Sequence, residues 1–163
     1  MEYINDLLEN VSGKQFLDIG AGYGVEAILA AKAGAESVIA VEADEQRAHY
    51  MERNAQANDV RISIRNWFVG TGSNGTTAID EIELSPDIVK IDIEGHEGEA
   101  LAGMKQTLET VERCYLELHP TMLPFDTSPD DIISIFSRLG FEMQEFDTDS
   151  RPVQRHLVFS RVS

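Results

Sequence analysis

Residues 16–24 read Phe16-Leu17-Asp18-Ile19-Gly20-Ala21-Gly22-Tyr23-Gly24. The run over 16–19 predicts a short buried β-strand, and the glycines after it predict a turn that opens a helix. Because glycine has no Cβ atom, such a turn lets a nucleotide approach the backbone closely. The spacing differs from the G-x-G-x-x-G dinucleotide fingerprint, whose last position here holds Val25. The turn therefore predicts a nucleotide-type ligand and disfavours a nicotinamide cofactor.

Strand and helix patterns alternate along most of the chain. Further strands are predicted over 37–41, within 60–69, and over 88–93 and 114–118, and helices over 2–11, 23–33, 45–57, 97–108 and 128–140. This alternation predicts an α/β fold, with a doubly wound, mostly parallel, Rossmann-like sheet and helices on both faces. Residues 141–146 and 156–160 are joined by a polar loop without a helix, so we expect an antiparallel C-terminal strand pair.

The length of 163 residues suits one domain. We expect an N-terminal helix over 1–12, a cofactor-binding core over 14–110, and C-terminal strands and a helix over 111–163. Cys114 is the only cysteine, which excludes an internal disulfide framework and a multi-cysteine metal site. The apolar runs are too short to cross a bilayer and no signal peptide is recognisable, so we expect a cytoplasmic protein without a membrane partner.

The formal net charge is −16. Neutralising phosphates requires clustered lysine and arginine, so this charge predicts that the chain has no nucleic-acid partner. Three explanations of the acidic charge stay open: adaptation to high salt, a cationic substrate, or an ordinary acidic cytosolic protein.

A second acidic residue lies at the end of the next predicted strand. Glu42 at that place can accept hydrogen bonds from the hydroxyl groups of a ribose. Asp18 precedes the glycines by two residues, which resembles the first motif of the class I methyltransferases. We therefore predict S-adenosylmethionine as cofactor, bound by Asp18, Gly20, Ala21, Gly22, Gly24, Glu42, Ala43, Trp67 and Phe68. Trp67 and Phe68 could stack on adenine or simply pack a helix onto the sheet.

A second motif lies at the end of the most apolar central strand. Residues 90–97 read Lys90-Ile91-Asp92-Ile93-Glu94-Gly95-His96-Glu97 and resemble the K-x-D-x-E-G-x-E signature of the FkbM family of methyltransferases. Residues 78–82 and 116–119 also resemble the pattern of that family. Two positions depart from it, because Gly22 stands where the family usually has asparagine and Ala43 where it usually has proline.

The resemblance implies methyl transfer from S-adenosylmethionine to an oxygen atom, with a small-molecule or glycan acceptor. A neutral hydroxyl needs a base. We expect Asp92 to be the base or substrate anchor, Glu94 to support it, and His119 to be an alternative base. Lys90 and Glu94 could instead form a structural ion pair, and His119 could be an ordinary loop residue. Asp92 with Glu94 or Glu117 could hold a hard divalent cation, but two carboxylates are too few and no metal is predicted.

Two other functions stay open. A nicotinamide-dependent oxidoreductase would share the strand–turn–helix pattern. A non-catalytic module that binds S-adenosylmethionine would share the whole cofactor site, and the short segment before residue 16 favours this reading. In that case activity would need a partner, a homo-oligomer, or a mobile insertion such as residues 122–127.

Overall fold

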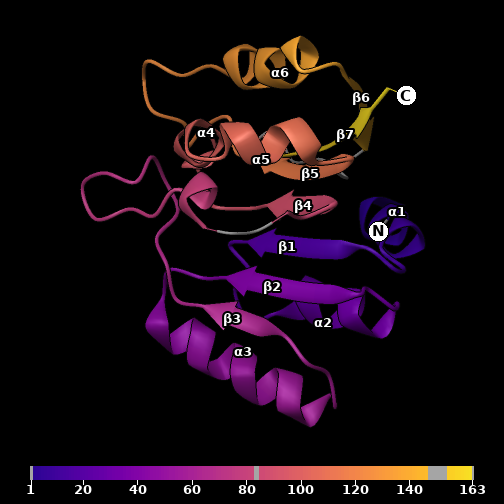
Figure 1. Ribbon diagram of the computed structural model, residues 1–163. Helices are drawn as coiled ribbons and strands as arrows, with labels where there is room; N and C mark the ends of the chain where they lie inside the picture. Colours follow the sequence, from indigo (N-terminus) through magenta and orange to yellow (C-terminus); the bar gives the residue numbers. More distant parts are fainter. Residues whose placement is uncertain (1, 83–84, 147–153, 163) are drawn as a thin grey trace.

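The computed structural model describes residues 2–82, 85–146 and 154–162. In these residues the strands form one sheet in the order β3-β2-β1-β4-β5-β7-β6 (Figure 1). The first five strands pair in parallel, whereas β7 is antiparallel to both β5 and β6. The predicted fold, with its antiparallel C-terminal pair, is thus confirmed. The strands are β1 Gln15–Ile19, β2 Ser37–Val41, β3 Ser63–Arg65, β4 Ile88–Ile91, β5 Arg113–Leu118, β6 Phe141–Phe146 and β7 Arg155–Arg161.

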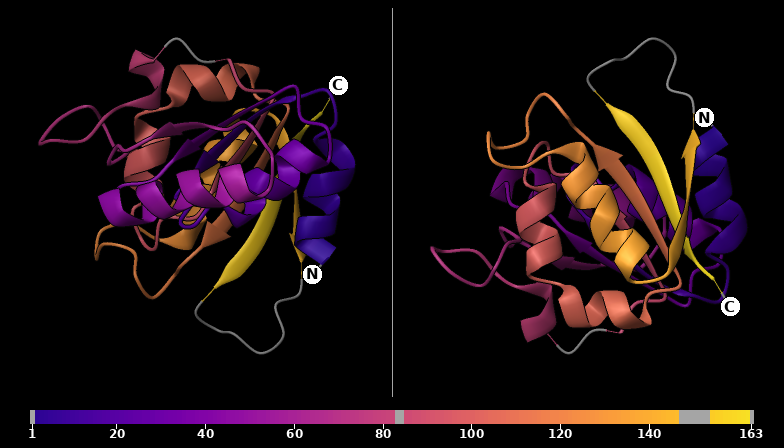
Figure 2. Two further views of the ribbon diagram at one scale, coloured as in Figure 1. Left: turned by 90° about the horizontal axis from the view of Figure 1, so that it is seen from below. Right: turned by 90° about the horizontal axis from the view of Figure 1, so that it is seen from above.

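Helices cover both faces of this sheet (Figure 2). Buried residues of α1, α2 and α3 form the apolar cluster on one face, and those of α4, α5 and α6 form the cluster on the other. In the described residues, no helix has the length and apolar character needed to cross a membrane. The helices are α1 Glu2–Asn10, α2 Val25–Lys32, α3 Glu45–Ala57, α4 Glu97–Ala102, α5 Lys105–Thr110 and α6 Pro129–Arg138, with a 3-10 turn η1 at Ile79–Glu81.

Alternation along the central strands separates apolar from polar side chains. Leu17 and Ile19 of β1 join the cluster beneath α4–α6, while Phe16 joins the cluster beneath α1–α3. Asp18 therefore points to the same face as Phe16. The register places Asp18 opposite Lys90 of β4, so an acid and a base lie side by side inside the sheet.

Local capping explains where two helices begin. The Asp44 carboxylate accepts a hydrogen bond of 2.8 Å from the Arg47 amide and starts α3. Ser128 and Asp131 form a reciprocal capping box at the start of α6, with a proline in its first turn. The sequence predicted both starts.

The predicted helix over 97–108 is wrong in one respect, because it is broken into α4 and α5 at Gly103. A Cβ atom on Gly103 would lie 1.8 Å from the Gly70 carbonyl oxygen, so the loop backbone is packed against the break. Asp80 of η1 then accepts hydrogen bonds of 2.9 Å from the amides of Gln106 and Thr107 in the first turn of α5. The cap comes from a distant segment, which local periodicity does not reveal.

The strand predicted over 88–93 is shorter than expected, since β4 ends at Ile91. Glu94 has a φ of 50°, and the following Gly95 a φ of 99°, so the chain turns sharply there. The proposed division at residues 12–14 and 110–111 falls in the turns before β1 and β5 and stays a prediction. Most of the polar loop expected between the last two strands lies outside the described residues.

Gly20 permits the closest approach between central strands, and its replacement should be costly. Its φ is 82°, and a Cβ atom there would lie 1.9 Å from the Asp92 carbonyl oxygen. Gly13 has a φ of 73° with nothing within 4 Å of such an atom, so it is a matched control. We expect Gly13→Ala to cost about 1 kcal/mol in the free energy of unfolding and Gly20→Ala roughly 3 kcal/mol. Urea unfolding measures both, and equal losses would contradict the packing argument.

Candidate active site

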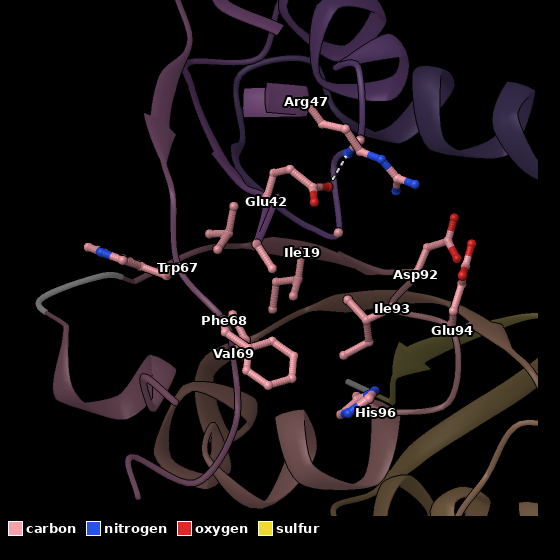
Figure 3. A pocket seen from close by; sticks show the side chains of 14 residues that line it. Ile19, Glu42, Arg47, Trp67, Phe68, Val69, Asp92, Ile93, Glu94 and His96 are labelled. Carbon is pink, nitrogen blue, oxygen red and sulfur yellow. Dashed lines mark hydrogen bonds between the residues drawn. The ribbon is translucent and has the colours of Figure 1, made fainter. Parts of the chain in front are cut away.

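A pocket of about 260 Å³ lies at the carboxyl ends of β1, β2 and β4 (Figure 3). The strand order reverses here, since β1 pairs with β2 on one side and β4 on the other. Open α/β sheets bind their ligands at such a point. The lining residues are Ile19, Gly20, Gly22, Val41, Glu42, Ala43, Arg47, Trp67, Phe68, Val69, Asp92, Ile93, Glu94 and His96.

The pocket brings together most of the residues predicted to bind cofactor and two of those predicted to be catalytic. Four predicted residues do not line it: Asp18, Ala21, Gly24 and His119. Ala21 and Gly24 are buried within the turn, where a Cβ atom on Gly24 would lie 2.5 Å from Met51. Sequence reasoning missed Arg47 and gave His96 no role.

Glu42 ties two loops of the pocket together. Its Oε2 accepts a hydrogen bond of 2.8 Å from the Gly22 amide, and its Oε1 accepts one of 2.9 Å from the Asp44 amide (Figure 3 shows the first). Each carboxylate oxygen has two lone pairs, so both can still accept a ribose hydroxyl. The buried Glu42 is thus held ready as an acceptor at the pocket wall.

The two aromatic residues have different surroundings. Phe68 is exposed, and its ring meets that of His96 edge-on at 5.2 Å between centroids. Trp67 is partly buried against the apolar cluster, with the Arg65 guanidinium 5.7 Å above its ring. Phe68 therefore offers an open aromatic surface to an adenine ring, whereas Trp67 both lines the pocket and packs the core.

Lys90 lies buried among carboxylates on the face beneath α1–α3. Its Nζ lies 4.0 Å from Asp18 Oδ1, 3.5 Å from Asp92 Oδ2 and 3.7 Å from Glu117 Oε1. Burial lowers the pKa of Lys90, but these carboxylates outweigh it and raise that pKa above its usual range. Lys90 therefore pairs with this group, and the alternative pairing with Glu94 is not what the geometry favours.

The carboxylates around Lys90 also have shifted pKa values. Burial raises the pKa of Asp18 to about 7 although Lys90 opposes the change. Burial likewise raises the pKa of Asp92, again opposed by Lys90. Neither oxygen of Asp18 has a hydrogen-bond partner among the described residues, which is why desolvation prevails.

His119 lies next to the pocket and connects two acids. Its Nδ1 is 2.9 Å from Glu97 Oε1, and its Nε2 is 3.8 Å from Asp92 Oδ1. The hydrogen bond to Glu97 raises the pKa of His119, against the effect of burial. The sequence matched Glu97 to the family signature but assigned it no partner. The only sequence signal for a role of Glu97 was an acidic residue in the first turn of a predicted helix.

Two ligands can be compared with the side chains of this site, a metal ion and S-adenosylmethionine. In the described ranges, no group of three or more histidine, cysteine, aspartate or glutamate side chains is arranged to hold a metal ion. The pocket does fit S-adenosylmethionine: Glu42 suits the ribose, Phe68 the adenine, and the open backbone at Gly22 the amino-acid part.

Two family models match the chain. The "Methyltransferase FkbM domain" matches residues 76–143, and the "Ribosomal protein L11 methyltransferase (PrmA)" model matches residues 1–84, just over half of the chain. The ribosomal protein L11 methyltransferase of Thermotoga petrophila is 38% identical over 77 residues. That match covers 47% of this chain and 26% of the relative, so this chain corresponds to about a quarter of the relative.

Solved structures share the fold. Magnesium protoporphyrin IX methyltransferase from Synechocystis PCC 6803, solved with bound S-adenosylmethionine, has a TM-score of 0.74 at 20% identity, covering 99% of this chain and 79% of that one. Methyltransferase FkbM from Methylobacillus flagellatus KT has a TM-score of 0.73 at 20% identity, covering 90% and 43%. An rRNA methylase from Streptococcus thermophilus has a TM-score of 0.74 at 12% identity, covering 99% and 95%.

The fold is that of the class I methyltransferases, and the pocket fits their cofactor, S-adenosylmethionine. The chain belongs to the family that the ribosomal protein L11 methyltransferase (PrmA) model describes, and its residues 76–143 are similar to the FkbM methyltransferase domain. The predicted FkbM resemblance and the predicted cofactor are confirmed. This result leaves no support for the nicotinamide alternative.

The predicted partners were wrong. We expected a small-molecule or glycan acceptor and no nucleic acid, but similar proteins are named as methyltransferases of ribosomal protein L11 and of rRNA. The small-molecule or glycan acceptor came from the FkbM resemblance, and the exclusion of nucleic acid came from the net charge of the whole chain. Net charge governs long-range attraction and solubility, and it does not describe the contacts made at one site.

Removing the Glu42 carboxylate should weaken cofactor binding. We expect Glu42→Ala to raise the dissociation constant for S-adenosylmethionine by about 10- to 100-fold, because a charged acceptor and the tie between two loops are lost. Calorimetric titration measures the change. Glu45→Ala, at an exposed position in the first turn of α3, is the control and should bind as the unaltered chain does. Unchanged affinity in Glu42→Ala would contradict the assignment of the pocket.

The raised pKa of Asp18 predicts a pH-dependent stability. Its pKa is about 7 in the folded chain against an ordinary value of 3.8, so its protonated form stabilises the fold at low pH. This contribution to the free energy of unfolding is lost as the pH rises from 3.8 to about 7, at up to about 1.4 kcal/mol per pH unit. Asp18→Asn is neutral throughout and should therefore gain stability relative to the unaltered chain over this range. Urea unfolding at several pH values tests this, with the exposed Asp130→Asn as control. Parallel curves for Asp18→Asn would refute it.

Proposed function

We propose that this chain is a catalytically active methyltransferase that transfers a methyl group to an oxygen atom of a protein acceptor. The observation that carries the proposal is the pair formed by Asp92 and His119 beside the cofactor pocket, 3.8 Å apart. Binding alone would not require two proton-accepting side chains at the place where an acceptor must arrive. This argues against a purely cofactor-binding module.

The division of labour follows from the pocket walls. Glu42 and the backbone at Gly20 and Gly22 hold and orient the cofactor, with Phe68 against its adenine. The cofactor, when bound, supplies an electrophilic methyl group on a positively charged sulfur atom. The chain's own residues then have to place the acceptor in line with that methyl group and remove its proton.

Asp92 and His119 are the proposed proton acceptors. A neutral hydroxyl is a poor nucleophile until a base takes its proton. Asp92 lines the pocket with Oδ1 toward His119, while its Oδ2 lies 3.5 Å from the Lys90 ammonium. The buried Lys90 ammonium thus fixes the position of the Asp92 carboxylate by an ion pair. Glu94, exposed on the same rim with its strained backbone, is proposed to contact the acceptor.

A protein acceptor is supported by sequence and by charge. The first half of the chain matches the L11 methyltransferase model, and a net charge of −16 attracts basic proteins. A second pocket of about 560 Å³ shares His96 with the first and lies between α4, α6 and the loop over 122–127. Its wall combines the acidic Glu99 and Asp126 with the apolar Met122 and Ile135. We propose that this second pocket takes the acceptor segment.

The test is methyl transfer from radiolabelled S-adenosylmethionine to a total ribosomal protein fraction and, separately, to protein-free ribosomal RNA. We expect label in a protein band, and mass spectrometry should place the methyl group on a side-chain oxygen. Label in RNA alone would contradict the protein acceptor, and a methyl group on nitrogen would contradict the oxygen nucleophile. A folded chain that binds cofactor but labels neither fraction would contradict the proposal.

With the labelled protein as substrate, Asp92→Asn should transfer the methyl group about 100-fold more slowly, because one proton acceptor is lost. Its calorimetric affinity for S-adenosylmethionine should stay unchanged. Asp130→Asn makes the same chemical change at an exposed position on α6 and should retain the full rate. An unaltered rate in folded Asp92→Asn would remove Asp92 from the reaction.

A further inference from the structure

We infer that Glu97 is a positioning residue, which holds the His119 ring so that its Nε2 faces Asp92 and the incoming acceptor. This inference rests on the proposed function for what His119 does. The contact itself lies within the fold of this chain. The inference assigns a role to Glu97, the one buried acid of α4, which does not line the cofactor pocket.

The ring has two nitrogens with different surroundings. Nδ1 lies 2.9 Å from Glu97 Oε1, within hydrogen-bond distance, while Nε2 lies 3.8 Å from Asp92 Oδ1. A carboxylate only accepts hydrogen bonds, so Nδ1 carries the proton and donates it to Glu97. In the neutral ring the free lone pair is then on Nε2, on the side of the cofactor pocket. Without Glu97, nothing among these contacts would select that tautomer.

Burial argues that the Glu97 carboxylate has a purpose beyond packing. Glu97 is fully buried, and within the described residues its Oε2 has no hydrogen-bond partner. A buried carboxylate with an unpaired oxygen is destabilising, and an apolar side chain of similar size would avoid that penalty. An acid kept at such a place is most simply explained by what its other oxygen does, which is to contact His119.

The charges around His119 all favour its protonated form. Glu97 faces it from α4, Asp92 from the end of β4, and Glu117 from β5. The Lys90 ammonium, which pairs with Asp92 at 3.5 Å, carries the opposite charge. The hydrogen bond to Glu97 has the largest effect and raises the pKa of His119, while burial opposes it. His119 is thus a stronger base than an exposed histidine would be.

The proton balance follows from this arrangement. As the acceptor oxygen bonds to the methyl carbon, the carbon–sulfur bond breaks and its electron pair stays on sulfur. The hydroxyl proton moves to His119 Nε2, and the imidazolium that forms is stabilised by Glu97 on one side and Asp92 on the other. Water then removes the proton when the product leaves. No further reactant is needed.

The experiment is a histidine NMR titration of the cofactor-free chain. The resonances of His119 are assigned by their loss in His119→Gln, and nitrogen-15 shifts report which ring nitrogen carries the proton. We expect the Nδ1–H tautomer in the unaltered chain and a lower His119 pKa in Glu97→Gln, which keeps the acceptor oxygen and removes the charge. Glu97→Leu should lose the tautomer preference as well. Glu109→Gln removes a charge from an exposed position on α5 and should leave the His119 pKa unchanged.

An unchanged His119 pKa in folded Glu97→Gln would overturn the inference, as would an equal shift in Glu109→Gln or an Nε2–H tautomer in the unaltered chain. These results do not depend on activity, so they separate this inference from the proposed function. If methyl transfer is found, Glu97→Gln should slow it about 10-fold at neutral pH and move the acid limb of the pH profile to lower pH. If no acceptor is found, the tautomer and pKa results still decide the role of Glu97.

Discussion

The buried ammonium of Lys90 is the interaction on which the site depends. It lies between Asp18 of β1, Asp92 at the end of β4 and Glu117 of β5, so one cation ties together three neighbouring strands. Removing the single cation would leave buried carboxylates facing one another uncompensated, which is strongly destabilising. The strand ends that carry the site are therefore constrained by electrostatics as well as by backbone pairing. The same cation sets the environment in which Asp92 holds or releases a proton.

Much of the fold could be predicted because its signals are local. The helix over 45–57, the strand over 37–41 and the capping box at Ser128 all follow from periodicity and end residues within one segment. The cofactor pocket was predictable for a similar reason, since Gly20, Gly22 and Glu42 each follow a strand whose carboxyl end had to meet the others.

What could not be predicted depends on contacts between distant segments. Gly103 breaks the helix because Gly70 packs against it, and α5 is capped by Asp80 from another loop. The contact between His119 and Glu97 joins the end of β5 to α4, and no residue spacing in the sequence predicts it. The exclusion of a nucleic-acid partner failed for a different reason. Net charge describes the whole surface, whereas recognition depends on a few side chains at one rim.

The carboxylate of Glu42 has a consequence for how ligands enter and leave. Because it joins the turn after β1 to the residues after β2 through backbone amides, the fold itself ties both walls of the pocket together. Little conformational entropy then has to be lost when a ligand arrives, since the ordering was completed during folding. The cofactor and its demethylated product would therefore meet the same pair of walls, held together by one carboxylate.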